Sequence, residues 1–212
     1  MSTEFAIAEV MPGKLNALVK NIMRQTGESD PNAAVRLVNS GEWVVSKSTR
    51  SWYEDMGIIY FSVTSDGTTG PEWIKRLEDN GSRVGDYARS VLCSPDFKPT
   101  SGITTTVAVL KGFLFGGQTR NTKEIRAQAD RWQLSKPNAE VACLIREKFT
   151  NKEIEAMGLW YIVAMHKPIE DSDGAPGLLS ADCGVGGSWL RTHYDEPGFR
   201  WRRSCGFAFA RS

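Results

Sequence analysis

Hydrophobic positions recur with helical spacing in the first 45 residues of the chain. Five apolar residues fall at positions i, i+3, i+4, i+7 and i+8 of one helix face: Leu15, Leu18, Val19, Ile22 and Met23. Gly27 ends this pattern, and Asp30-Pro31 has the residue types of an N-cap followed by a first-turn proline. The pattern predicts two short helices, the second ending before Gly41, in an N-terminal helical segment over residues 1–45.

Two short helices joined by a tight turn are also the layout of a DNA-binding helix-turn-helix. The second helix carries few basic residues, so we favour a packing or homo-oligomerisation element over DNA binding.

Residues 46–212 alternate between strand-like and helix-like patterns. The predicted strands are rich in β-branched and aromatic residues and cover residues 57–64, 104–110 and 159–165. The predicted helices cover residues 71–80, 85–92 and 141–149, with capping-box sequences at Asn121 to Glu124 and Thr150 to Glu153. The expected fold class is α+β, without internal repeats.

Composition excludes some functional classes. With 212 residues, 41% hydrophobic and 24% charged, the chain can bury a core without crosslinks. A net charge of +1 gives no overall case for nucleic acid or anionic membranes. No apolar run approaches a membrane span, and the N-terminus lacks the pattern of a signal peptide. We therefore expect a cytoplasmic location, with surface or virion display left open.

Candidate catalytic and metal-binding residues do not form a recognisable motif. His166 is followed by Asp171, Asp173, Cys183 and His193, but these spacings match no compact metal site. Asp171 to Gly174 fits a turn whose Asp side chains cap the backbone better than a calcium loop. A Cys205–His193 nucleophile pair would require the fold to bring the two together. We expect no enzyme activity, metal or cofactor.

The last 45 residues have an unusual composition. Pro168 to Ser212 contain no Lys, Asn, Gln or Met, whereas the first 167 residues contain 29 of these. The segment instead carries arginine, aromatic, glycine and cysteine residues. Its run Arg200-Trp-Arg-Arg203 would suit phosphate contact and base stacking, so nucleic-acid binding by this run and the N-terminal helices is one alternative function.

Three landmarks in this segment carry a resemblance to a known fold. Gly186-Gly-Ser-Trp189, Trp201 and the terminal Gly206-Phe-Ala-Phe209 resemble the C-terminal part of C-type-lectin-fold proteins of the formylglycine-generating type. The resemblance implies a C-type-lectin-like C-terminal domain with a ligand-facing surface. The paired catalytic cysteines of that group cannot be placed here, although an enzyme on this fold is a second alternative.

The composition more closely resembles the variable region of a protein diversified by a retroelement, here residues 181–205. In that family, adenines of a template are miscopied, and an AAC or AAT codon can become many residue types but not Lys, Gln, Glu, Met or Trp. The positions between the landmarks all fall within the permitted types: Cys183, Gly184, Val185, Ser188, Arg191, His193, Tyr194, Gly198, Phe199, Arg202, Ser204 and Cys205. An unvaried lectin-like end with this composition by chance is the other interpretation.

The resemblance implies two groups of residues in this segment: buried residues that form a scaffold and exposed residues that contact a ligand. The expected scaffold residues are Trp189, Leu190, Trp201, Gly206, Phe207 and Phe209. The twelve positions given above would then contact a ligand, and arginine and aromatic side chains on rigid loops are typical of protein-binding surfaces. We therefore expect a non-enzymatic protein that binds varied ligands, mainly other proteins.

Overall fold

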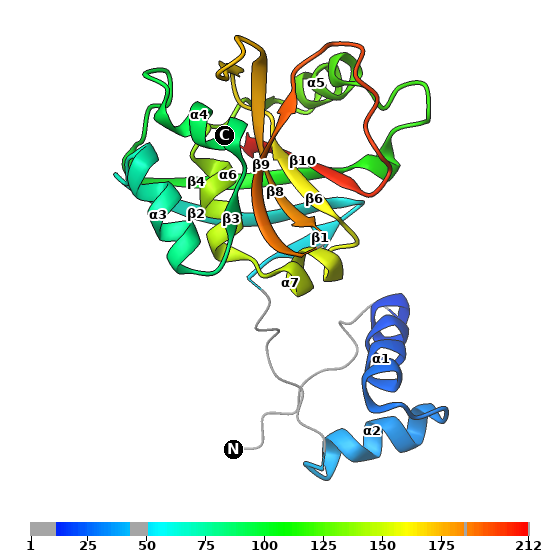
Figure 1. Cartoon of the computed structure of the whole chain (residues 1–212). Helices are drawn as coiled ribbons and strands as arrows, with labels where there is room; N and C mark the ends of the chain where they lie inside the picture. Colours follow the sequence, from blue (N-terminus) through cyan, green and yellow to red (C-terminus); the bar gives the residue numbers. More distant parts are fainter. Residues whose placement is uncertain (1–11, 43–50, 185, 212) are drawn as a thin grey trace. The chain divides into compact units, whose positions relative to one another are not determined.

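The structure is a computed structural model that describes residues 12–42, 51–184 and 186–211 (Figure 1). Its contacts divide the chain into two units, residues 1–49 and 50–212. The boundary expected between residues 45 and 46 lies outside the described residues. Helices and strands both contribute extensively, so the α+β class is confirmed.

The first unit contains the two predicted helices. α1 (Pro12–Thr26) and α2 (Pro31–Asn39) pack against each other and bury Ile22 and Ala34. The Asp30 side chain caps α2 by accepting a hydrogen bond from the Asn32 backbone at 3.0 Å, as its position before Pro31 predicted. Leu15 and Leu18 of the predicted apolar stripe are exposed.

The second unit is organised around one mixed sheet. Its main strands run in the order β1-β2-β4-β10-β6-β8-β9-β3, with β5 beside β10 and β7 beside β8. The bounds are β1 (Tyr53–Asp55), β2 (Ile58–Asp66), β3 (Arg83–Val84), β4 (Ser101–Lys111), β5 (Leu134–Ser135), β6 (Tyr161–Ala164), β7 (Ile169–Glu170), β8 (Pro176–Gly184), β9 (Gly187–Tyr194) and β10 (Cys205–Arg211).

The C-terminal strand β10 joins the two halves of this sheet. It pairs antiparallel with β4 along one edge and parallel with β6 along the other, with Phe207 beside both Leu110 and Val163. The first part of the unit contributes β2 and β4, and the last part contributes the β8–β9 hairpin. Residues 205–211 are therefore central to the fold rather than a peripheral tail.

Helices cover the sheet unequally on its two sides, as Figure 1 shows for α3 and α4 on one side of β9 and α5 on the other. The helices are α3 (Gly70–Asp79), α4 (Asp86–Cys93), α5 (Thr122–Arg131), α6 (Val141–Lys148) and α7 (Asn151–Ala156), with a 3-10 turn η2 (Gly112–Leu114). α3, α4, α6 and α7 supply one core, which we call the helical core. α5, with Phe115 and Trp201, supplies the other, which we call the aromatic core.

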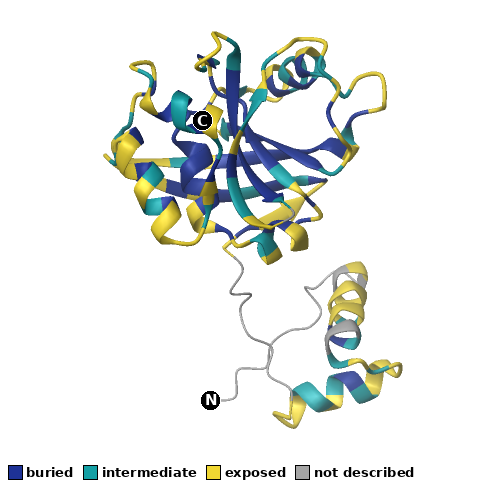
Figure 2. Cartoon of the chain, in the orientation of Figure 1, coloured by how far each residue is buried: buried dark blue, intermediate teal, exposed yellow. Residues whose placement is uncertain are grey.

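Successive side chains of a strand point to opposite faces of the sheet, so alternate residues pack into the two cores. In β6, Ile162 enters the helical core and Val163 the aromatic core. In β10, Ala208 enters the helical core, while Phe207 and Phe209 enter the aromatic core. Because both faces are covered, these strands are hydrophobic along most of their length and appear largely dark blue in Figure 2.

Most of the predicted elements are confirmed, with small shifts of their ends. The helix expected over residues 71–80 is α3, and the strand expected over 57–64 is β2. The capping box at Thr150 forms in full, since its hydroxyl and backbone N–H both interact with the Glu153 carboxylate and the hydroxyl accepts from the Glu153 N–H. The strand expected over 159–165 is shorter, covering Tyr161–Ala164. Among the described residues, no helix is long and apolar enough to cross a membrane.

Gly206 allows β10 to approach its neighbours closely. A Cβ atom at this position would lie 2.5 Å from Cγ1 of Val109 and 2.8 Å from Cδ1 of Leu159. We expect Gly206→Ala to lower the free energy of unfolding by about 1–3 kcal/mol, because the added methyl overpacks the core. Urea denaturation followed by circular dichroism measures this. Gly117→Ala, where an added Cβ has no neighbour within 4 Å, is the control; equal effects of the two substitutions would contradict the close approach.

Candidate functional site

A cleft of about 430 Å³ lies on the aromatic-core side of the sheet, where the β8–β9 hairpin meets the loop before β10. It combines three arginines with aromatic side chains and one carboxylate. Its lining residues are Trp160, Tyr161, Asp182, Cys183, Gly184, Arg191, His193, Phe199, Arg200 and Arg202.

Backbone hydrogen bonds around Trp160 bring the walls of the cleft together. The Trp160 N–H donates to the carbonyl of Ser204 at 2.8 Å, and the Trp160 carbonyl accepts from the N–H of Cys183 at 2.8 Å. The start of β6 therefore lies between the end of β8 and the start of β10. The Trp160 side chain, which is 58% exposed, remains available to solvent.

His193 connects the cleft to the aromatic core. Its ring stacks on Tyr161, with centroids 4.9 Å apart and an interplanar angle of 18°. It also makes an edge contact with Trp201 at 5.4 Å. Trp201 in turn contacts Phe199 and Phe207 edge-on, and its indole N–H donates to the Thr122 hydroxyl at 3.0 Å. These edge-on contacts hold His193 between the core and the cleft.

The carboxylate of Asp182 faces His193 from the neighbouring strand. Its Oδ2 lies 3.8 Å from His193 Nε2, and its Oδ1 accepts a hydrogen bond from the Ser180 hydroxyl at 2.6 Å. His193 Nε2 has no hydrogen-bond partner among the described residues. Ser180 is fully buried and its hydroxyl is directed to Asp182, so this Ser–Asp–His set does not present a serine nucleophile to the cleft.

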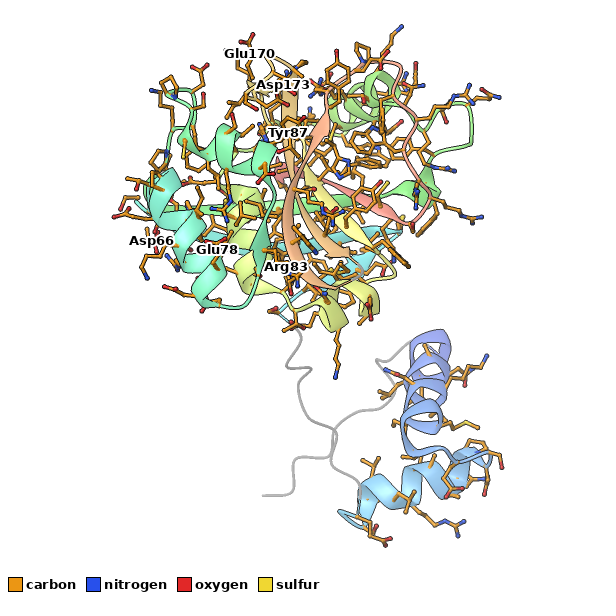
Figure 3. All side chains as sticks on the ribbon, viewed as in Figure 1. Asp66, Glu78, Arg83, Tyr87, Glu170 and Asp173 are labelled. Carbon is orange, nitrogen blue, oxygen red and sulfur yellow. The ribbon has the colours of Figure 1, made fainter. Side chains whose placement is uncertain are left out.

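Arg191 is oriented by Trp189. Its guanidinium carbon lies 4.5 Å from the centre of the indole ring, and Arg83 lies over the same ring at 5.2 Å. Figure 3 labels Arg83 on β3, which is paired with β9. A Cβ at Gly184 would lie 3.0 Å from Trp189 Cδ1 and 3.4 Å from an Arg191 nitrogen, so glycine leaves room for this arrangement. The stack reduces the conformational freedom that Arg191 would lose on binding a ligand.

Arg200 and Arg202 approach from the loop opposite β9. Arg200 donates to Gln118 Oε1 at 2.7 Å, which fixes one of its terminal nitrogens. Within the described part of the chain, neither Arg191 nor Arg202 is in an ion pair with a carboxylate. The cleft therefore presents unneutralised positive charge.

A buried arginine supports the cleft from beneath. Arg146 of α6 donates to the carbonyl of Asp182 at 3.1 Å, to Asn151 at 3.0 Å and to the carbonyl of Phe149. Burial lowers the pKa of Arg146 from its usual value. These bonds fix the end of β8, and with it the position of the Asp182 carboxylate.

The structure brings together half of the predicted contact residues. Those lining the cleft are Cys183, Gly184, Arg191, His193, Phe199 and Arg202. Ser188, Tyr194, Gly198 and Ser204 are exposed or half-exposed but do not line it. Val185 lies outside the described residues.

Two predicted placements need correction. Cys205 was expected on the ligand-facing surface, but its side chain is fully buried, because strand alternation places it in the aromatic core with Phe207. Its thiol donates to the carbonyl of Arg202 at 2.6 Å. Trp189 was expected to be a buried scaffold residue, but it is half-buried and contacts two guanidinium groups. The other scaffold residues, Leu190, Trp201, Gly206, Phe207 and Phe209, are buried as expected.

Sequence reasoning missed four residues of the cleft. Trp160 and Tyr161 belonged to a predicted strand, and Asp182 was not considered as a contact. Arg200 was considered only as part of a basic run. For Trp160 and Tyr161 the missing information was the parallel pairing of β6 with β10, which no local pattern reveals.

No metal centre is found among the described residues, in which no group of three or more His, Cys, Asp and Glu side chains is placed to hold an ion. His166 is buried, accepts from the Leu179 N–H at 2.9 Å and has its pKa lowered to about 4 by burial. Asp171 caps a turn by accepting from the N–H groups of Asp173 and Ala175, as predicted. Figure 3 shows Asp173 near Tyr87, whose hydroxyl donates to it at 2.9 Å.

Comparisons with known proteins give no relatives. No family model, no curated protein and no solved structure matches this chain.

The reactivity of the cysteine thiols can show whether a reagent reaches the side chains of Cys183 and Cys205. Cys93 is exposed, whereas Cys143, Cys183 and Cys205 are buried. Burial raises the pKa of Cys205 to about 11 and raises the pKa values of the other two buried thiols. We expect a disulfide reagent at pH 8 to titrate one thiol rapidly in the native protein and all four in denaturant, and Cys93→Ser to remove the fast phase. A fast phase that persists in Cys93→Ser would reveal an accessible thiol at Cys183 or Cys205.

Proposed function

We propose that this chain is a non-enzymatic ligand-binding protein and that its ligand, an acidic segment of another protein, binds in the cleft between β9 and the loop before β10. The observation that carries this proposal is the convergence of Arg191, Arg200 and Arg202 in a cleft with a single carboxylate, Asp182. Opposite charge on a partner would complement this surface.

The mixture of side chains supports a protein ligand. Arginine and aromatic residues make up most of the energetically important contacts of protein interfaces. Trp160 and Phe199 provide apolar surface at the cleft, and the arginines provide directional hydrogen bonds. Nucleic-acid binding would use a longer track of phosphate contacts, and Arg203 of the predicted basic run does not line the cleft.

We further propose that the C-terminal region is C-type-lectin-like and that its contact positions are diversified by a retroelement. Support comes from two glycines with positive φ values, Gly186 in the turn between β8 and β9 and Gly187 at the start of β9. The burial of Trp201, Phe207 and Phe209 also supports it, because these anchors would let exposed neighbours vary at small energetic expense. The buried positions Cys183 and Cys205 would vary least.

Sequencing of the genomic neighbourhood and of sibling genes tests the diversification. We expect a reverse transcriptase and a template repeat that differs from the gene only at adenines. We also expect variation among siblings at Arg191, His193, Phe199 and Arg202, with Trp201 and Phe207 constant. Variation spread evenly along the chain, with no template repeat, would rule out the retroelement.

Selection from a random peptide display library tests binding in the cleft. We expect the full chain to enrich peptides rich in Asp and Glu, and an Arg191→Ala/Arg202→Ala double variant to lose them, because it removes two unpaired charges. Arg203→Ala, which removes one arginine charge from the same segment but outside the cleft, should retain them. Enrichment of the same peptides by the double variant would place binding elsewhere and refute the proposal.

A further inference from the structure

The cleft carries more positive charge than one carboxylate would neutralise. Its lining includes three arginines and one aspartate, and the charges of these four groups sum to +2 (three minus one). A phosphomonoester carries about −1.5 to −2 at neutral pH, whereas a glutamate side chain carries a single negative charge. The charge of the cleft therefore matches a phosphate better than a carboxylate.

The geometry of the arginines suits phosphate oxygens. Arg191 is held by its stack on Trp189, and Arg200 by its hydrogen bond to Gln118. Arg202 has no ion pair among the residues that the structure describes. Guanidinium groups donate paired hydrogen bonds to phosphate, and a phosphate offers enough acceptor oxygens for all three arginines.

Aromatic side chains lie beside this charge. Trp160 is largely exposed, Phe199 is half-buried, and Tyr161 lines the cleft beneath His193. The volume of about 430 Å³ is within the range of sites that hold a small molecule, so it accommodates a ring together with a phosphate. A phosphate on an aliphatic side chain would leave these ring surfaces unused.

We infer that the cleft binds a phosphomonoester carried on an aromatic ring, and that its source is a phosphotyrosine in a partner protein. This inference rests on the proposed function for the identity of the partner. Arg191 and Arg202 would contact the phosphate, and Trp160 would stack on the ring.

Fluorescence polarisation with the full chain tests the inference. The probe is a fluorescein-labelled, glycine-flanked phosphotyrosine peptide, compared with the same peptide carrying tyrosine, phosphoserine or glutamate. We expect the phosphotyrosine peptide to bind about tenfold more tightly than the other three, because it alone combines the dianion and the ring. Adenosine monophosphate, as a competitor, should bind more weakly than the phosphotyrosine peptide.

Substitutions test where the peptide binds, and they distinguish the contribution of the arginine charges from that of stacking on Trp160. We expect Arg191→Ala and Arg202→Ala each to weaken binding by about tenfold or more, since each removes a charged hydrogen bond. Arg203→Ala should remain within about twofold of the unsubstituted chain, because its charge lies outside the cleft. Trp160→Ala should weaken the phosphotyrosine peptide but not the phosphoserine peptide. Thermal melting of each variant shows whether it folds. If Arg191→Ala does not fold, the substitutions at Arg202 and Trp160, whose side chains are exposed, still test the inference.

The outcomes separate this inference from the proposed function. If the glutamate peptide binds as tightly as the phosphotyrosine peptide and its binding depends on Arg202, the phosphate inference is wrong. The proposal of an acidic protein ligand is then retained. If adenosine monophosphate binds more tightly than the phosphotyrosine peptide, both the phosphotyrosine assignment and the proposed protein ligand are wrong. Phosphotyrosine binding that is unchanged in both arginine variants overturns the site itself.

Discussion

The second unit depends on the pairing of β10 with both β4 and β6. This strand of seven residues connects the antiparallel pair β2–β4 to β6 and, through β6, to the β8–β9 hairpin. Antiparallel pairing on one edge and parallel pairing on the other satisfy its backbone hydrogen bonds. Its alternating side chains fill both cores, so the integrity of the whole sheet depends on residues 205–211.

The same short stretch of chain also limits where a binding surface can form. The loop between β9 and β10 must return Trp201 to the aromatic core, where it contacts Phe207 and bonds to Thr122. Because Trp201 is fixed, the residues on either side of it project outward, and Arg200 and Arg202 reach the cleft. The position of the cleft is therefore a consequence of how the central strand is anchored.

Local elements of this fold could be predicted from the sequence, but their pairing could not. The caps at Asp30 and Thr150 and the apolar run before His166 gave helices and strands close to their true positions. The composition of the C-terminal segment predicted Arg191, His193 and Arg202 as contact residues, and the structure places all three at the cleft. Trp160 and Asp182 were not predicted because they reach the cleft only through the pairing of β6 and β8 with their neighbours. The prediction for Cys205 was wrong because its burial follows from the alternation of side chains along β10.

The contacts within the cleft divide its residues into two energetic classes. His193 packs against Tyr161 and Trp201, so its replacement would change contacts that continue to Phe207 and the sheet. Arg191 and Arg202 are exposed, and their replacement would change charge while leaving the core contacts in place. Variation in ligand preference at constant fold would therefore be concentrated at the arginines. A change at His193 would be tolerated only if the other neighbours of Trp201 kept that side chain in position. At His193, therefore, the proposed binding and the stability of the fold would conflict.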